Sequence, residues 1–168
     1  MCIRDSINCD EFDKSVEILK LFTAAAINLK LGAILEKAIV EHMPKWFNGQ
    51  NNCNKIVLQV SLGGIQTIES ICKKYELEVL NLGREIDLEY CISDVVWNHT
   101  TLQMRAKDKN WTYLQMLLPL GNELKLIKTM KKKYGKNLLW HLEAVSQQGV
   151  PRLAALPVLK WSGENELN

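Results

Sequence analysis

Apolar side chains recur every three or four residues along most of this chain, and this spacing constrains the fold more than any other feature. The pattern is clear from Phe12 to Leu29 and again from Ile65 to Tyr75. Similar apolar stripes occupy 34–43, 88–99, 111–118, 124–134, 138–145 and 153–161. An amphipathic helix must bury its apolar stripe against a neighbour. The sequence therefore predicts an all-α fold, a multi-helix bundle of about eight helical segments.

The segment 56–62 departs from this pattern, because its apolar residues alternate as they do in a strand. No convincing partner strand is evident nearby, and a lone strand would leave its backbone hydrogen-bonding groups unpaired. A buried helix that ends at Gly63-Gly64 is therefore favoured over the alternative, a short strand at 56–62.

The first six residues, Met1-Cys2-Ile3-Arg4-Asp5-Ser6, have the pattern of an artefact. Reverse-translated, they give ATG TGT ATA AGA GAC AGN, which resembles the end of a transposon-type sequencing-library adapter and fits a metagenomic source. We predict that residues 1–6 are a scar and not native. Residues 7–161 would then be a single helical domain and 162–168 a polar tail. The native start would be missing, and the chain would be the back end of a longer protein.

The composition is that of an ordinary soluble protein, with 47% hydrophobic and 24% charged residues. No apolar run approaches the roughly 18 residues of a membrane span. None of the five cysteines (Cys2, Cys9, Cys53, Cys72 and Cys91) forms a Cys-x-x-Cys motif or lies near a histidine in the sequence. Scattered thiols of this kind are typical of small buried side chains in a reducing compartment. We therefore expect a cytoplasmic protein.

The segment 105–136 is strongly basic, with nine Lys/Arg against two Asp/Glu. Its cations are Arg105, Lys107, Lys109, Lys125, Lys128, Lys131, Lys132, Lys133 and Lys136. One interpretation is a free-standing helical module that binds nucleic acid or an acidic partner through this face. The other is a solvated helix face, because the lysines of 122–135 lie opposite the apolar stripe and the last turn of a helix favours cations. The sequence favours the solvated face and makes nucleic acid an improbable partner.

No catalytic, cofactor-binding or metal-ligating residue is predicted. His42, His99 and His141 lack a second histidine or carboxylate at the spacing that places two ligands on one side of a helix. Glu143 follows His141 by two positions, so on the predicted helix the two side chains diverge. No glycine-rich phosphate loop or nucleophile elbow is present.

Six short blocks, in order along the chain, are similar to blocks in the C-terminal helical region of the large bacterial NAD-dependent glutamate dehydrogenases. They are Met43-Pro44-Lys45-Trp46-Phe47, Gly64-Ile65-Gln66 with Ile68, Leu77-Glu78-Val79-Leu80, Ile92-Ser93-Asp94-Val95-Val96-Trp97, Trp111 with Leu114, and Leu153-Ala154-Ala155-Leu156-Pro157-Val158. The resemblance implies a parent oxidoreductase that deaminates glutamate with NAD bound upstream of this chain. The chain itself would be a non-catalytic packing or assembly domain. Its partners would be the rest of the parent chain or a neighbouring subunit, with no metal and no membrane.

Overall fold

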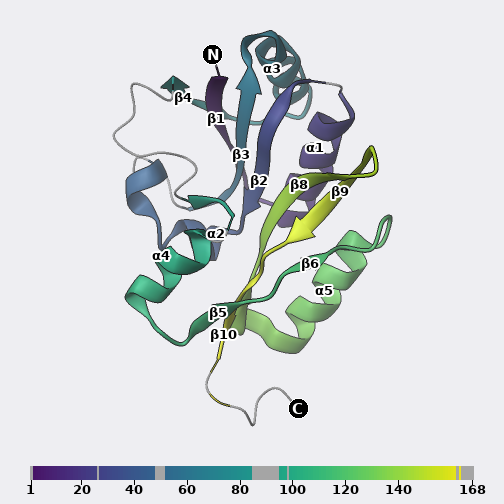
Figure 1. Cartoon of the computed structure of the whole chain (residues 1–168). Helices are drawn as coiled ribbons and strands as arrows, with labels where there is room; N and C mark the ends of the chain where they lie inside the picture. The colour runs from purple at the N-terminus through teal and green to yellow at the C-terminus, as the bar shows by residue number, and fades with distance from the viewer. Residues whose placement is uncertain are drawn as a thin grey trace.

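The computed structural model describes residues 2–25, 27–47, 52–84, 95–97, 99–161 and 163 (Figure 1). These residues form two antiparallel sheets and several helices, so the chain has a mixed α/β fold. The predicted all-α bundle is wrong. None of the described helices is both long enough and apolar enough to cross a membrane.

The larger sheet has seven strands in the spatial order β4-β1-β3-β2-β8-β9-β6. They are β4 (Val79–Arg84), β1 (Cys2–Cys9), β3 (Asn54–Ser61), β2 (Leu29–Leu35), β8 (His141–Gln147), β9 (Val150–Ala155) and β6 (Met116–Leu117). The smaller sheet has the order β5-β10-β7, formed by β5 (Trp111–Tyr113), β10 (Val158–Lys160) and β7 (Leu138–Leu139).

The described helices are short and are distributed along the chain between the strands. The α-helices are α1 (Phe12–Ala24), α2 (Lys37–Val40), α3 (Ile65–Lys74), α4 (His99–Lys107) and α5 (Glu123–Tyr134). Three 3₁₀ turns accompany them, η1 (Pro44–Phe47), η2 (Leu62–Gly64) and η5 (Gly135–Asn137).

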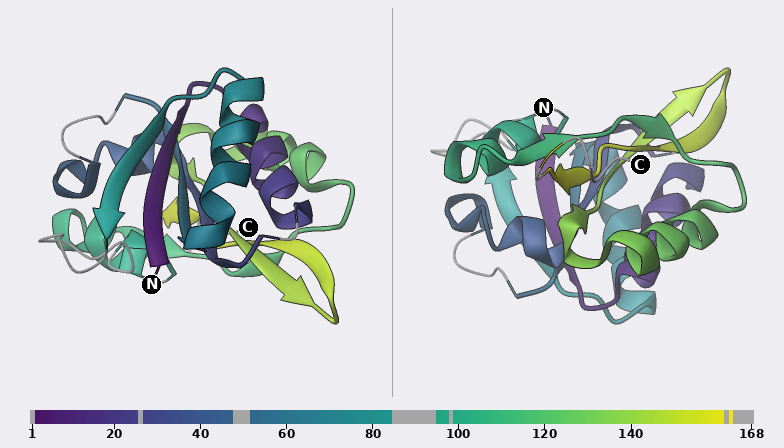
Figure 2. Two further views of the ribbon diagram at one scale, coloured as in Figure 1. Left: turned by 90° about the horizontal axis from the view of Figure 1, so that it is seen from above. Right: turned by 90° about the horizontal axis from the view of Figure 1, so that it is seen from below.

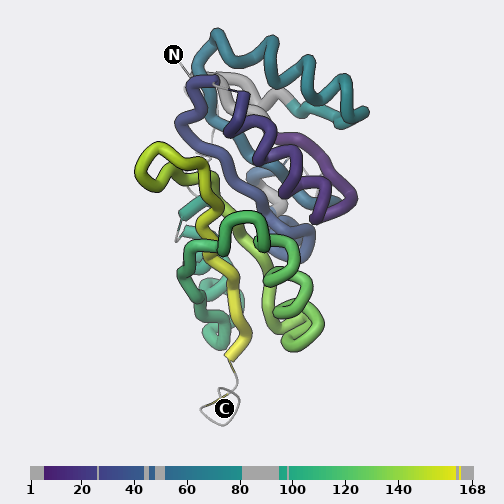
Figure 3. The backbone as a smooth tube through the Cα atoms, turned by 90° about the vertical axis from the view of Figure 1, so that its right-hand side faces the viewer, coloured from purple at the N-terminus to yellow at the C-terminus, as the bar shows by residue number. Residues whose placement is uncertain are grey.

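The first half of the chain is a split βαβ arrangement. Its strands and longer helices follow the order β1-α1-β2-β3-α3-β4, and the strands lie side by side in the order β4-β1-β3-β2. Helices α1 and α3 lie on the same side of this sheet (Figures 2 and 3). Strand β8 then extends the sheet by pairing with β2, where Leu35 is opposite His141.

Both faces of the larger sheet are buried, which explains the wrong helix predictions. Phe22, Ile56 and Leu58 belong to the apolar core beneath α1, α3 and α5. Leu35 and Val57 belong to a second core, on the face covered by α2, η1 and α4. Strands buried on both faces have continuous apolar runs instead of alternation, and such runs also satisfy a helical period.

The structure confirms three of the predicted helices and corrects five other segments. The predicted stripe at 12–29 is helical only to Ala24, in α1, and its last residue, Leu29, begins β2. The stripes at 65–75 and 124–134 correspond to α3 and α5. The segments 111–118, 138–145 and 153–161 are mainly strand, and 34–43 begins as the end of β2. The segment 56–62 lies mostly in β3, whose partners β1 and β2 are distant in the sequence. The stripe at 88–99 falls largely outside the described residues.

Residues of the predicted adapter scar form part of strand β1. Cys2 is opposite Ser61, and the pairing with β3 continues to Cys9 opposite Asn54. Strand pairing uses backbone N–H and C=O groups, which every non-proline residue supplies whatever its origin. The pairing therefore does not test whether residues 1–6 derive from an adapter, and their origin stays a prediction. Of the predicted polar tail 162–168, only Gly163 is described.

Charged contacts attach α5 to α1. Lys20 lies 3.3 Å from the buried carboxylate of Glu123, and Lys128 lies 2.6 Å from Asp13. Burial is the largest influence on the pKa of Glu123 and would raise it, but hydrogen bonds from backbone N–H groups and the Lys20 ammonium together lower that pKa. The ionised carboxylate thus stabilises the first turn of α5.

We expect Phe22→Ala to lower the free energy of unfolding by about 3–5 kcal/mol, because it leaves a cavity between α1 and the sheet. Phe22 is fully buried in the first core. The matched control is Leu21→Ala on the same helix, where the side chain is 37% exposed and the loss should stay below about 1 kcal/mol. Urea unfolding measures both values, and equal losses would contradict this packing.

Candidate functional site

The face of the larger sheet that points away from α1, α3 and α5 carries a row of polar side chains, which we call the polar face. In the register, Asn8 is opposite Lys55, Lys55 is opposite Leu35, and Leu35 is opposite His141. Lys55 and His141 have no exposed surface, and Glu143 on the same face is 7% exposed. Burying ionisable groups is costly unless each finds a partner, so the contacts of these side chains are informative.

The first polar group on this face is centred on Asn8. Its side-chain oxygen accepts hydrogen bonds from the ammonium of Lys55 and, at 3.3 Å, from the thiol of Cys53. Its side-chain nitrogen donates to Glu78 Oε2 at 2.6 Å. Cys53 and Lys55 are two positions apart, so their side chains lie on the same side of the extended chain.

Lys55 is the most deeply buried cation described. Burial is the largest influence on the pKa of Lys55 and lowers it, while the charge and hydrogen bond of Cys53 and the charge of Glu78 raise it. The net effect is a lowered pKa. The Phe47 ring lies 5.6 Å from the Lys55 nitrogen and stabilises its charged form.

A cavity of about 560 Å³ opens at this end of the sheet, where β1 ends and β3 and β4 begin. We call it the acidic cavity, because its ionisable lining has four carboxylates and one lysine. The lining residues are Asn8, Cys9, Asp10, Glu11, Lys14, Asn52, Cys53, Glu76, Leu77 and Glu78. Cavities of this size are in the range that binds small molecules.

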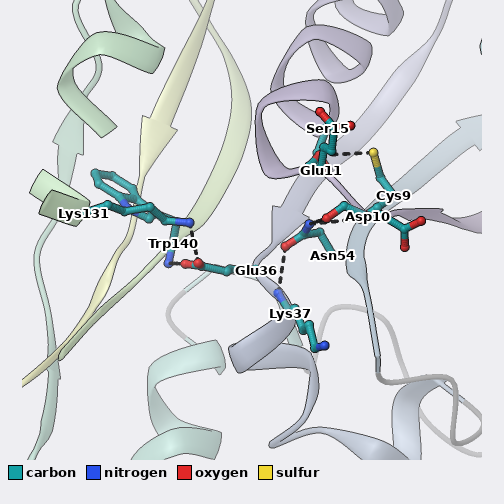
Figure 4. A network of polar contacts seen from close by, with 9 residues as sticks. All are labelled: Cys9, Asp10, Glu11, Ser15, Glu36, Lys37, Asn54, Lys131 and Trp140. Carbon is teal, nitrogen blue, oxygen red and sulfur yellow. Dashed lines mark hydrogen bonds and ion pairs between the residues drawn. The ribbon is translucent and has the colours of Figure 1, made fainter. Parts of the chain in front are cut away.

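Asn54 fixes the chain that forms one wall of the acidic cavity (Figure 4). Its side-chain nitrogen donates to the backbone oxygens of Cys9 and Asp10, both at 3.0 Å. Its side-chain oxygen accepts from the backbone nitrogen of Lys37 at 3.0 Å, which ties the same residue to the start of α2. Cys9 in turn donates from its thiol to the Glu11 backbone oxygen. The wall is therefore held by side-chain and backbone bonds together.

Glu36 provides a parallel link between β2 and the second half of the chain (Figure 4). Its carboxylate accepts from the backbone nitrogen of Trp140 at 2.7 Å and lies 2.5 Å from the Lys131 ammonium. The Lys131 ammonium also lies 4.5 Å from the centre of the Phe12 ring. These contacts hold β8, α5 and the start of α1 in fixed relation to the polar face.

The second polar group joins Thr100, His141 and Glu143. His141 Nδ1 lies 2.9 Å from the Thr100 hydroxyl, which donates its proton to the Val95 backbone oxygen at 2.6 Å. His141 Nδ1 must therefore carry a proton and donate to Thr100. Glu143 also accepts a hydrogen bond from the backbone nitrogen of Trp97 at 2.5 Å.

His141 and Glu143 face each other, contrary to the prediction that they diverge. They lie on strand β8, where residues two apart share a face, and not on a helix. His141 Nε2 lies 3.2 Å from Glu143 Oε1, within ion-pair distance but without hydrogen-bond geometry. Since Nδ1 is already protonated, this contact is attractive only when a second proton resides on Nε2 or on the carboxylate.

The structure divides the predicted basic face into two separate parts. Arg105, Lys107 and Lys109 lie on or just after α4, whereas the other six cations lie on or just after α5, on the other side of the smaller sheet (Figure 1). Several are already engaged: Arg105 donates to the Trp111 backbone oxygen, Lys107 to that of His42, and Lys128 and Lys131 form ion pairs. Binding of an anionic partner by these residues stays a prediction.

Sequence reasoning did not detect the two polar groups of the polar face. The signal available for the first was a lysine directly before an apolar run, Lys55 before Ile56-Val57-Leu58. The signal for the second was the His141-x-Glu143 spacing, which brings the side chains together only in a strand. Among the described residues, no group of three or more His, Cys, Asp or Glu is arranged to hold a metal ion.

Comparison with known proteins shows the fold alone. No family model matches the chain, and no curated protein matches its sequence. A solved structure of an alkyldihydroxyacetonephosphate synthase is similar, with a TM-score of 0.64 and 12% sequence identity. The similarity covers 99% of this chain and 37% of the synthase chain. The chain thus spans little more than a third of this structural neighbour.

These findings overturn the predicted helical packing domain of a glutamate dehydrogenase. The neighbour has a β-rich fold, and the blocks that carried the resemblance fall on strands and turns as well as helices. Leu77-Glu78-Val79-Leu80 leads into β4, and Leu153 to Val158 spans the end of β9 and the start of β10. The free-standing helical module is excluded on the same grounds. The NAD expected in a parent enzyme stays a prediction.

We expect Lys55→Met to change how stability depends on pH. The pKa of Lys55 is lowered in the folded state, so between that value and the ordinary lysine value of about 10.4 the unfolded chain binds more protons. Stability from this residue should rise with pH across that window, by up to about 1.4 kcal/mol per pH unit, and be independent of pH below it. The unfolding free energy of wild type minus variant should therefore grow as the pH rises towards 10. Lys37→Met, at an exposed lysine, should give a constant difference.

We expect His141→Leu and Glu143→Gln to be strongly coupled in a double-mutant cycle, with an interaction energy of about 1–3 kcal/mol from urea unfolding. The reason is that each residue alone is left buried without its partner. The comparison cycle uses the more exposed pair Lys160 and Asp108, 3.0 Å apart, for which the coupling should be below about 1 kcal/mol. Equal couplings in the two cycles would contradict a strong interaction between His141 and Glu143.

Proposed function

We propose that this chain is the ligand-binding part of a larger enzyme and that its acidic cavity binds a small polar molecule without negative charge. The observation that carries the proposal is the concentration of polar groups at one end of the larger sheet. Fully buried Lys55 and half-buried Asn8 lie there, beside the acidic cavity. Costly buried polar groups are most often retained where they serve binding or chemistry.

The charge of the lining selects the class of ligand. Asp10, Glu11, Glu76 and Glu78 line the cavity, and Lys14 is the single cation among the lining residues. A phosphate group would meet net repulsion here, whereas hydroxyl or amine groups would find acceptors. The structural neighbour is named for a phosphate-containing compound, so the charge of this cavity favours a different ligand from the one in that name.

The proposed partner is the rest of a parent chain or a neighbouring subunit. Support comes from the share of the synthase chain that the similarity covers, 37%. Support for a cytoplasmic location comes from the free thiols of Cys9 and Cys53, which are typical of a reducing compartment.

Dihydroxyacetone and dihydroxyacetone phosphate test the proposal, because they share a carbon skeleton and differ in the charged group. Each is titrated at millimolar concentration into ¹⁵N-labelled protein while the side-chain amide signal of Asn8 is followed by NMR. We expect dihydroxyacetone to shift this signal and the phosphate to shift it less. The exposed Asn137, outside the cavity, serves as the control signal.

The variant Glu78→Gln keeps the shape of the lining and removes one negative charge. It should reduce the difference between the two probes. No shift at Asn8 with either probe, or a larger shift with the phosphate, would contradict the proposed ligand class.

A further inference from the structure

We propose that Cys53 is a nucleophilic thiol and Lys55 its proton acceptor, and that the pair forms covalent bonds with small carbon electrophiles that enter the acidic cavity. The inference rests on the proposed function only for the preference of the cavity for uncharged reagents. The reactivity of the thiol itself does not depend on which ligand binds there.

The two side chains converge on one acceptor. The Cys53 thiol lies 3.3 Å from Asn8 Oδ1, and the Lys55 amine donates to the same oxygen. This shared acceptor places the Lys55 amine beside the Cys53 thiol. Cys53 is half-buried and lines the cavity, whereas Lys55 is fully buried behind it. The sulfur can therefore meet a reagent on one side and the amine on the other.

Burial gives Lys55 the property that a proton acceptor needs. Only the neutral amine can accept a proton, and desolvation lowers the pKa of Lys55 and so favours that form. In the reaction the thiol proton moves to Nζ and the sulfur forms a bond to carbon. The bond from carbon to the leaving group breaks, and the leaving group departs with the electron pair. The resulting ammonium is stabilised by Asn8 Oδ1 and by the Phe47 ring.

The other groups around Cys53 make this assistance necessary. The charged groups of the lining are Asp10, Glu11, Lys14, Glu76 and Glu78. Four of these five are carboxylates, which oppose the formation of a thiolate. Lys55 shares the Asn8 Oδ1 acceptor with the thiol, so its neutral amine is the base that carries the activation.

Cys9 provides a control within the same cavity. It also lines the cavity, but it is only 2% exposed and its thiol donates to the Glu11 backbone oxygen at 3.3 Å. If local opening of the cavity gave the reagent access to the thiols, Cys9 and Cys53 would both be labelled. If Lys55 activates Cys53, Cys53 is labelled selectively.

The test measures the rate of alkylation by iodoacetamide at each cysteine, by peptide mapping and mass spectrometry between pH 6 and pH 9. An unassisted thiol with a pKa of about 8.5 is about 3% ionised at pH 7, so its rate rises nearly tenfold per pH unit there. We expect Cys53 to react about tenfold faster than such a thiol at pH 7, with a rate that rises less steeply with pH. Cys9 should react slowly throughout.

Lys55→Met should slow the reaction of Cys53 about tenfold at pH 7 and much less at pH 9, where solvent removes the thiol proton. Lys14→Met, which removes the cation of the lining, should leave the rate within about twofold. Equal rates in wild type and Lys55→Met would overturn the proposal. The pH profile of the wild-type protein is a second test of the proposal. If the alkylation rate of Cys53 rises as steeply with pH as that of an unassisted thiol, the proposal is overturned without any variant.

Iodoacetate separates this inference from the proposed function. It carries a negative charge and is otherwise similar to iodoacetamide. Fast reaction of Cys53 with iodoacetamide but not with iodoacetate supports both proposals. Equally fast reaction with the two reagents supports the activated thiol and contradicts the charge preference. Slow reaction with iodoacetamide overturns the activated thiol and leaves the ligand class to the NMR titration.

Discussion

The pairing of β3 with both β1 and β2 is the constraint on which the rest of the structure depends. It places three strands from distant parts of the chain in one continuous ladder, from Cys9 opposite Asn54 to Leu35 opposite Lys55. The helices α1, α3 and α5 can then bury their apolar sides on one face. The opposite face becomes enclosed by α2, η1 and α4, and its polar residues have to be satisfied within the protein.

The polar face has a thermodynamic cost that the apolar face does not. An apolar residue in place of Lys55 would avoid the desolvation that lowers its pKa. His141 and Glu143 are buried as well, and their contact is attractive only when a second proton is present on one of them. Stability alone does not account for two such arrangements on one sheet. Their position, beside the acidic cavity in one case and next to an exposed Trp97 in the other, is better explained by binding and chemistry.

Sequence periodicity identified the surface helices and failed for the buried strands, for a physical reason. Helices α1, α3 and α5 each have a solvent-exposed side, so their apolar residues show the helical period clearly. Residues 31–35 of β2 are buried throughout, and β3 is similar, so alternation is lost. The site was missed for the same reason. Cys53, Lys55 and Asn8 meet only through strand pairing between residues about 45 positions apart, and nothing local indicates it.

A fold shared at 12% identity preserves the path of the backbone and not the chemistry of its side chains. In this chain the path brings the end of β1, the start of β3 and the start of β4 together. Any protein with this topology therefore has a place where three strand ends meet. Whether that place is reactive depends on which residues occupy it. Here they are a thiol, a buried amine and an amide that accepts from both, surrounded by carboxylates. The function of this chain must be derived from that set, because the fold alone is compatible with many activities.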